Sequence, residues 1–405
     1  MSSLSQIWTC IVQEALDSQV LDGEKRGLIN NFLLDQPYYR ETSAAAKIFA
    51  TQYILTGERI FHERASMALR AIENIVNNST LRNGIDEPFI SPRGLRSRKG
   101  SIPATIILFE YAEEAAGLLH VQMNWDTDLF LSFIERCYLG GGRFYHDVIS
   151  NCHSKYPHII NTSAMAYYFL QAINRDHDYG LIPQRVIPKT RERILSSARS
   201  DGFFPYIEPQ VWQRAFFRIH RFFPLLFTKV FNRILGDHAI FFGDTLHHIV
   251  TIYYFMKASS IGDKALSNSQ KRALQKSWHF IKNHLTEYKD TFIKIDFSWE
   301  PVPTCYRHAN FVDTSAYFYL IDLLRYLPLH GLISRIEADY YVEGLSNHIR
   351  DRLLRPEHIP CIQAYEGRQE IIENIMPRPS ESVFIKGALF SNTILERQAS
   401  EGREN

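Results

Sequence analysis

The 405-residue sequence has almost no net charge, few cysteines and no long apolar run. Its formal net charge is +1, so no global field favours nucleic acid as a partner. The five cysteines are odd in number and scattered, which indicates a reducing compartment and argues against a disulfide framework. The sequence contains no stretch of about 18 uncharged apolar residues, so no transmembrane helix is predicted. Residues 1–20 lack the basic start and apolar block of a secretory signal. The sequence therefore predicts a cytoplasmic globular protein.

What the sequence does contain is a repeated phrase at the start of apolar, helix-like segments. Clear copies carry Thr-Ser-Ala after positions 41, 161 and 313, a looser copy begins at 244, and weaker copies begin at 99 and 386. The third positions of the six copies are separated by 58, 62, 83, 69 and 73 residues. A period this long accommodates two helices and a loop, so six helical hairpins in a closed ring are predicted. The aligned third residues are Ser43, Ser101, Ser163, Leu246, Ser315 and Ala388.

The helix that each phrase opens differs from the helix that precedes it. Residues 164–173, 247–256 and 316–324 are apolar on most faces, which predicts inner helices covered by others. Residues 61–75 are apolar on one side only, which predicts an outer helix. Short aromatic segments at 142–145, 202–206 and 292–297 alternate in polarity and predict short strands.

These features resemble the six-hairpin α/α toroid superfamily. The resemblance rests on the Thr-Ser-Ala helix starts, the turn at 55–58 before an alanine-rich amphipathic helix, and the aromatic segment at 201–206. That superfamily includes glycoside hydrolases, toroid domains of polysaccharide lyases, lanthionine cyclases and terpenoid cyclases. The resemblance implies an all-α fold, a single (α/α)6 toroid over residues 1–395 with short β-hairpins in its loops. The polar composition of residues 396–405 predicts a frayed tail. One fold hosts many reactions, so the resemblance does not fix the chemistry.

In a toroid the residues that precede the helix starts point toward one end of a central cavity. Oxygen-bearing side chains there are good helix caps, which is their structural interpretation. A lysine opposes the helix dipole at the same place, so the two lysines indicate ligand contacts, or partners for the acids. The six residues are Glu41, Lys99, Asn161, Asp244, Asp313 and Lys386.

The loops before these starts are rich in titratable groups, which favours acid/base chemistry on a saccharide. We predict a hydrolase or lyase with Asp244, Asp313, Glu208 and His308 as acid/base groups, supported by Tyr206 and His247. Adjacent histidines face different ways on a helix, so one of His247 and His248 is expected to be a packing residue. The predicted substrate contacts are Arg96, Arg98, Lys99, Asn161, Glu300, Tyr306, Arg307, Glu41 and Lys386.

Three alternatives remain open at this stage, and the prediction itself includes no cofactor or metal. A zinc-dependent cyclase or transferase would draw on Cys152, His153, Cys305 and His308, since zinc prefers Cys and His ligands. In lanthionine cyclases glycines stand beside such ligands, and this sequence lacks them. A terpenoid or prenyl-handling enzyme would need closely spaced aspartates that are missing. A non-catalytic toroid that binds a glycan or a protein is the third alternative.

Two basic elements bear on the substrate. The predicted loop at 91–100 has four cations between Arg93 and Lys99, and it is either a solvated loop or a clamp for an anionic saccharide or glycoconjugate. Residues 212–235 form an inserted amphipathic segment with a basic face and an aromatic face. That segment is predicted to pack on the ring, to form a lid, or to contact an anionic membrane as a peripheral protein.

Overall fold

The computed structural model describes most of the chain, and every structural statement below refers to that part. No helix in it is long and apolar enough to cross a membrane. The described ranges are 2–31, 36–78, 84–91, 94–146, 159–176, 181–205, 245–262, 265–289, 291–296, 311–363, 365–367 and 383–404.

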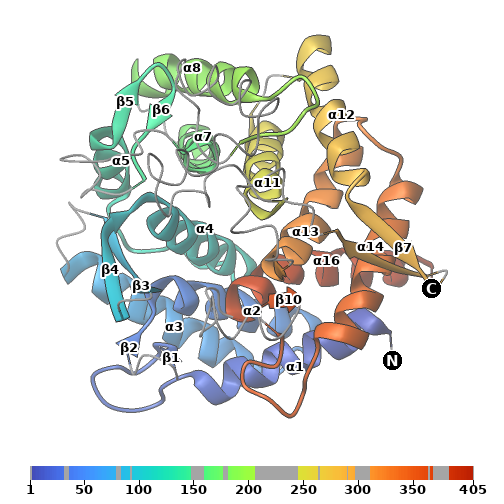
Figure 1. Ribbon diagram of the computed structural model, residues 1–405. Coiled ribbons are helices and arrows are strands. Elements are labelled where there is room, and N and C mark those ends of the chain that lie inside the picture. The colour runs from blue at the N-terminus through green and yellow to red at the C-terminus, as the bar shows by residue number, and fades with distance from the viewer. Residues whose placement is uncertain are drawn as a thin grey trace.

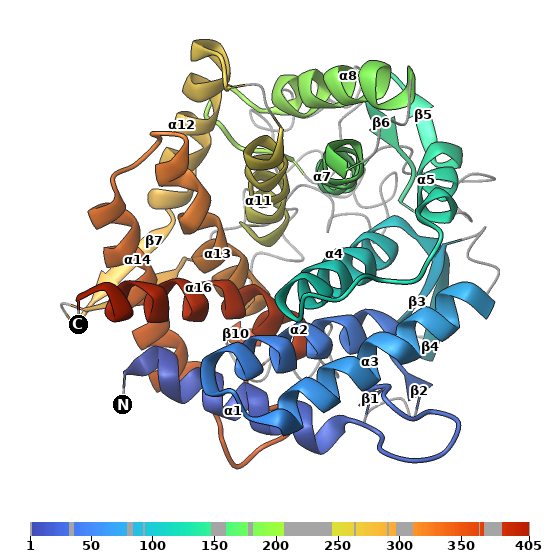
Figure 2. The same cartoon turned by 180° about the vertical axis from the view of Figure 1, so that it is seen from behind.

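Six helices form a closed inner ring (Figures 1 and 2). Each contacts the next one along the chain, and the last returns to the first. The ring is therefore complete, as the six copies of the repeated phrase predict. Its members are α2 (Tyr39–Thr56), α4 (Ile102–Leu118), α7 (Ile160–Asp176), α11 (Thr245–Ile261), α13 (Ser315–Leu329) and α16 (Val383–Glu404).

In the described part of the chain, six further helices lie outside this ring (Figure 1). Each precedes its inner partner in the chain, so the architecture is six outer-to-inner hairpins, an (α/α)6 toroid. The last outer helix ends in a π-helical turn, η3 (Ile349–Leu353). The outer helices are α1 (Ser3–Ser18), α3 (Arg59–Asn78), α5 (Thr127–Arg136), α8 (Leu181–Ser197), α12 (Asn268–Lys282) and α14 (Arg335–His348).

The inner and outer helices differ in burial as their sequences predict. In α11 every residue from His248 to Ser259 is buried, because an inner helix is covered on all sides. In α3 the buried residues recur at helical spacing and form one face only, as in an amphipathic outer helix. Those residues are Phe61, Ala65, Ala68, Leu69, Ile72 and Val76.

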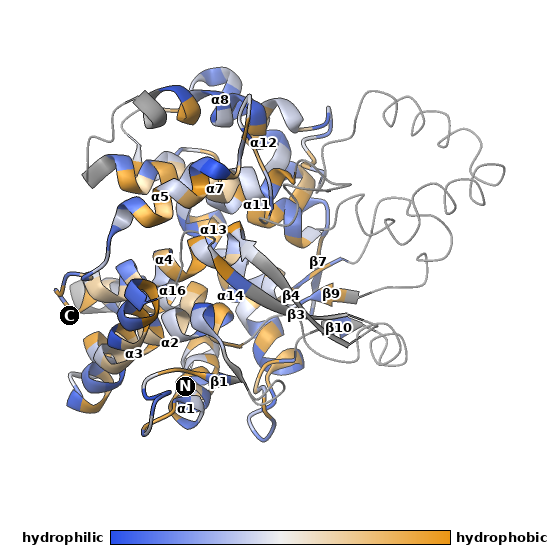
Figure 3. Cartoon of the chain, turned by 90° about the vertical axis from the view of Figure 1, so that its left-hand side faces the viewer, coloured by the Kyte–Doolittle hydropathy of each residue, from blue (hydrophilic) through white to orange (hydrophobic). Residues whose placement is uncertain are grey.

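Short antiparallel strand pairs lie at the end of the toroid where the inner helices begin, which we call the front face (Figure 3). There β4 (Gly94–Ser101) runs directly into α4 and pairs with β3 (Ile85–Ser91), while β9 (Phe311–Asp313) leads into α13 and pairs with β10 (Tyr365–Gly367). Three more pairs are β1 (Asn30–Asn31) with β2 (Gln36–Pro37), β5 (Tyr138–Gly140) with β6 (Arg143–Phe144), and β7 (Leu285–Tyr288) with β8 (Phe292–Ile295).

Three local predictions need correction. The predicted basic loop at 91–100 is largely strand, because β3 and β4 pair as a hairpin. The predicted strand at 202–206 is irregular over its described part, 202–205, where Gly202 has a φ of +93°. The predicted tail from 396 is not frayed, since α16 continues to Glu404. Glu396 accepts a hydrogen bond of 2.8 Å from Arg325 Nε, which ties this part of α16 to α13.

Candidate functional site

The repeated phrases all reach the front face. Each aligned residue caps an inner helix or lies within its first two turns, so the six starts surround one end of the toroid. This is the arrangement that the sequence predicts for a site. Ser101 caps α4 by accepting from the amide of Ala104, whereas Thr42 and Ser43 donate to the carbonyls of Tyr38 and Arg40.

Two of the acids at the helix starts have identifiable partners. Glu41 is buried and forms an ion pair of 3.0 Å with Nε of Arg40, its neighbour in α2. Asp313, at the end of β9, accepts a hydrogen bond of 2.9 Å from the amide of Ser315 through Oδ1. Asp313 thus provides a partner for the first amide of α13, whose N-cap residue is Thr314, and its half-buried carboxylate lies at the front face.

Asn161, Lys386 and His247 also lie on the first turns of inner helices. Asn161 is buried on α7, and its Oδ1 has no hydrogen-bond partner among the described residues. Lys386 is buried on α16, close enough to Glu14 of α1 to oppose the rise in pKa that burial causes in that carboxyl. His247 is half-buried on α11.

His248 is the packing member of the histidine pair. It is fully buried and stacks on Phe203. Its Nδ1 accepts a hydrogen bond of 2.9 Å from the amide of Phe204. The prediction that one of the two adjacent histidines serves packing is therefore confirmed.

Many of the predicted site residues lie wholly or partly outside the described part of the chain. For Arg96, Arg98 and Lys99 the structure gives the backbone only, in β4, where Arg98 lies opposite Glu87 of β3. No group of three or more His, Cys, Asp or Glu that could hold a metal occurs among the described residues. Outside those residues lie segment 212–235 and the side chains of Tyr206, Glu208, Asp244, Glu300, Tyr306, Arg307, His308, Cys152, His153 and Cys305.

Sequence reasoning missed a network next to Asp313. Glu366 of β10 accepts a hydrogen bond of 2.6 Å from the Tyr317 hydroxyl and contacts His348 Nε2 at 3.0 Å. His348 in turn lies 2.6 Å from the Tyr288 hydroxyl through Nδ1. Burial alone would raise the pKa of Glu366, but the contacts with His348 and Tyr317 outweigh it and lower the pKa. The network fastens the β9–β10 pair to α13 and α14.

Sequence reasoning also missed a layer of charge in the middle of the inner ring. Lys257 of α11 forms an ion pair with Glu110 of α4 and another, of 2.6 Å, with Glu114. Glu114 also pairs with Lys47 of α2 at 2.5 Å. The Tyr254 hydroxyl donates a hydrogen bond of 2.9 Å to Glu110. We call these five side chains, with the Asp322 group below, the polar layer.

Burial perturbs the pKa values within this layer. Burial lowers the pKa of Lys47, and the nearby charge of Lys257 lowers it further. Burial raises the pKa of Glu110 despite the attraction of Lys257. For Glu114, Lys257 and Lys47 outweigh burial and lower the pKa to about 2. Burial would lower the pKa of Lys257, but its two carboxylate partners raise it well above its usual value.

The layer continues through Asp322 of α13. Its carboxylate accepts hydrogen bonds of 2.6 Å from Arg325 Nη1 and 2.9 Å from the Tyr253 hydroxyl. Asn392 of α16 donates to the same carboxylate at 3.2 Å. With Lys47, Glu110 and Lys257, these contacts link five of the six inner helices.

The polar layer is better suited to structure than to chemistry. Lys257 and Glu110 are buried, and their charges face one another. The layer lies roughly 7 to 12 residues beyond the inner-helix starts, which at 1.5 Å per residue is about 10–18 Å from the front face. The layer therefore lies deeper in the ring than the helix starts that form the candidate site.

Comparisons with solved structures identify the fold. No known family model and no curated protein matches the sequence. An unsaturated glucuronyl hydrolase from a Bacillus species, described as responsible for glycosaminoglycan degradation, shares 12% identity at a TM-score of 0.59, over 96% of this chain and 94% of that chain. A cellobiose 2-epimerase from Bacillus thermoamylovorans shares 10% identity at a TM-score of 0.60, over 95% of this chain and 98% of that chain. A type II terpene cyclase from Scytonema shares 11% identity at a TM-score of 0.50, over 96% of this chain and 95% of that chain. Over nearly its whole described length, the chain is an (α/α)6 toroid.

Proposed function

We propose that this protein is a carbohydrate-active enzyme whose site is the front face. The observation that carries the proposal is the convergence of six inner-helix starts at one end of a closed ring, with Asp313 half-buried at one of them. Several toroids of similar structure are named as enzymes that act on saccharides, among them an unsaturated glucuronyl hydrolase and a polysaccharide lyase. A terpene cyclase with this fold shows why the fold alone does not decide the chemistry.

We further propose an anionic saccharide or glycoconjugate as the substrate, cleaved by hydrolysis or elimination. The support is the position of the basic strand: β4 carries Arg96, Arg98 and Lys99 and leads straight into α4 at the front face. Guanidinium groups match the geometry of carboxylate and sulfate oxygens. In this proposal Asp313 and Asp244 are the acid/base pair, and the charged strand binds the uronate or sulfate groups.

The test is incubation of the purified protein with paired neutral and uronate-containing oligosaccharides, followed by product analysis. Hydrolysis releases a new reducing end, whereas elimination also creates an unsaturated uronate with ultraviolet absorbance. Asp313→Asn retains an oxygen that can cap α13 but removes the charge, so it is expected to lower kcat by at least about a hundredfold, the range of general acid/base catalysis. Asp339→Asn is the matched control, because Asp339 lies exposed on outer helix α14.

Two results would contradict the proposal. Full activity in Asp313→Asn would remove this residue from the acid/base pair. Binding of oligosaccharides without any product would leave a glycan-binding toroid in place of an enzyme.

A further inference from the structure

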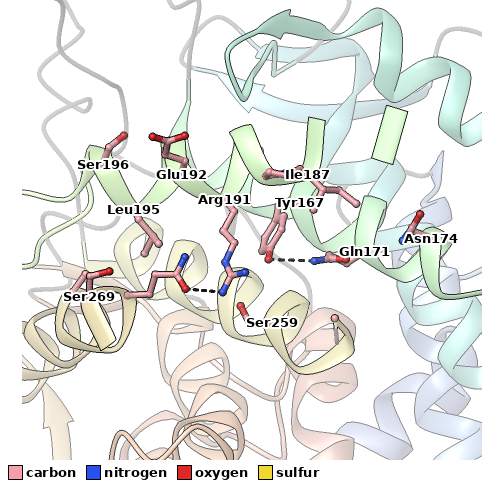
Figure 4. A pocket seen from close by; sticks show the side chains of 14 residues that line it. Tyr167, Gln171, Asn174, Ile187, Arg191, Glu192, Leu195, Ser196, Ser259 and Ser269 are labelled. Carbon is pink, nitrogen blue, oxygen red and sulfur yellow. Dashed lines mark hydrogen bonds between the residues drawn. The ribbon is translucent and has the colours of Figure 1, made fainter. Parts of the chain in front are cut away.

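A cavity lies away from the front face, between inner helices α7 and α11 and outer helices α8 and α12 (Figure 4). It has a volume of about 920 Å³. Gln171 and Asn174, in the last turns of α7, and Ser259, near the end of α11, line it. Because the inner helices begin at the front face, their last turns place this cavity at the opposite end of the toroid.

One charged side chain faces into the cavity. Figure 4 shows Arg191 reaching from α8 toward Ser259 of α11, whereas Glu192 points away on the other side of α8. Glu192 is exposed and Arg191 is half-buried. The interior of the cavity is therefore positive, although its rim includes a carboxylate.

The guanidinium of Arg191 is held in place and keeps donor capacity. Its Nη2 donates a hydrogen bond of 2.7 Å to Oε1 of Gln270, and Gln270 is itself fixed in the capping box at the start of α12. Its Nε is buried and has no hydrogen-bond partner among the described residues. Because Nε is out of reach of a ligand, an oxyanion in the cavity would contact the terminal Nη groups, and Nη2 keeps one hydrogen beyond its bond to Gln270.

The surrounding potential also favours an anion. Burial lowers the pKa of His330, and the nearby cations Lys271 and Arg191 lower it further. The remaining polar groups of the cavity are neutral amides and hydroxyls, including Gln171, whose Nε2 donates to the Tyr167 hydroxyl at 3.3 Å. Amides and hydroxyls both donate and accept, which suits a hydroxyl-rich molecule.

Gly262 lies next to the Gln171 side chain at the cavity wall. A Cβ added at Gly262 would lie 2.9 Å from the amide nitrogen of Gln171. Glycine at this position therefore leaves the Gln171 amide room at the cavity wall.

We propose that this cavity binds a small hydroxyl-rich oxyanion, such as a sugar acid or a sugar phosphate, with Arg191 as its anion contact. The two ligand sources share one chemistry: a single oxyanion on a polyol. The site is separate from the front face, and the proposal does not depend on the enzyme being carbohydrate-active.

The test is titration calorimetry of the full chain with glucuronate, glucose 6-phosphate, inorganic phosphate and neutral glucose. One of the two sugar anions should bind at least about tenfold more tightly than glucose or phosphate, and the better one identifies the source. Arg191→Gln should weaken that binding by about tenfold to a hundredfold, the range of a charge-assisted hydrogen bond. Arg272→Gln is the matched control, since Arg272 is exposed on α12 and does not line the cavity.

A second variant protects the test against misfolding of the first. Ala273→Leu adds volume to the cavity wall on α12 without changing charge, and it should also weaken binding while the thermal midpoint shows that the protein is folded. Unchanged affinity in Arg191→Gln would overturn the proposal and assign the ligand to another site, such as the front face. Binding of neither sugar anion at millimolar concentration would overturn it as well.

Discussion

Removal of the Lys257 ammonium should be one of the most destabilising changes in this protein. Lys257 lies between Glu110 and Glu114 in the polar layer, and its side chain is only 6% exposed. In Lys257→Met the stem still packs in the ring, but the charge is lost. Glu110 then retains the Tyr254 hydroxyl as its hydrogen-bond donor, while Glu114 retains Lys47.

The size of the effect follows from distance and burial. At 2.6 Å and an effective dielectric constant of about 20, one such ion pair is worth about 6 kcal/mol of Coulomb energy. Desolvation of the lysine offsets part of this, and breaking a buried pair from one side costs about 3–5 kcal/mol. We expect Lys257→Met to lower the free energy of unfolding by that amount.

The effect should also depend on pH with a predictable sign. Burial raises the folded-state pKa of Glu110, and loss of Lys257 raises it further. A carboxyl with a raised folded pKa stabilises the protein below its unfolded pKa of about 4.3, and this stability is lost as the pH rises through the folded pKa. Lys257→Met should therefore be less destabilising near pH 5 than near pH 8.

Urea unfolding measures the free energy of unfolding of four variants: Lys257→Met, Glu110→Gln, their combination and a control. Lys257→Met/Glu110→Gln removes both charges and should recover at least about 1 kcal/mol relative to the sum of the single variants, as coupled neighbours do. Lys276→Met is the control, because Lys276 is exposed on α12. A cost below about 1 kcal/mol for Lys257→Met, or strict additivity in the double variant, would refute the role assigned to this ion pair.

Three further predictions concern other parts of the fold. Glu366→Gln should weaken the acid dependence of stability: the folded pKa of Glu366 is lowered, so its contribution is present above pH about 4.3 and is lost as the pH falls through the folded pKa, which acid-unfolding curves would show. Gly202→Ala should cost more than about 2 kcal/mol, because the added Cβ would lie 2.4 Å from the backbone of Lys276. Gly331→Ala, also at positive φ but with open space around it, should cost only about 1 kcal/mol. Thermal melts of the two variants measure the difference. Phe169→Ala should cost about 3–5 kcal/mol by urea unfolding, since Phe169 is fully buried against the edge of Phe109.

The ring could be predicted from the sequence because its signals are local. A Thr-Ser-Ala phrase and the apolar helix after it depend on a few consecutive residues, and the spacing between phrases sets the number of hairpins. The strands at β6 and β8 carry the same kind of local signal. The β3–β4 hairpin carried no such signal, because the three cations of β4 resemble a solvated loop until strand pairing satisfies the backbone.

The polar layer and the Glu366 network could not be predicted in this way. Lys257 and Glu114 are 143 residues apart, and Glu366 meets Tyr317 across 49 residues. Single charges inside apolar helices were a visible signal, as at Lys257 and Asp322. Their partners, however, are fixed only by the closure of the ring, which no spacing along the chain encodes.

Ring closure also gives the polar layer a reason to exist. Apolar contacts between inner helices are non-directional, so a helix displaced by one turn, about 5.4 Å, would still bury Ala, Ile and Phe. Ion pairs between α4 and α11 are lost in such a shift, and therefore they specify one register, the best-supported use of buried charge. Because the helix starts that form the front face lie on these same helices, an error of register would separate Asp313 from its neighbours. A variant in which Glu110 and Lys257 are both replaced by apolar residues should therefore keep much of its stability, but it should lose oligosaccharide activity.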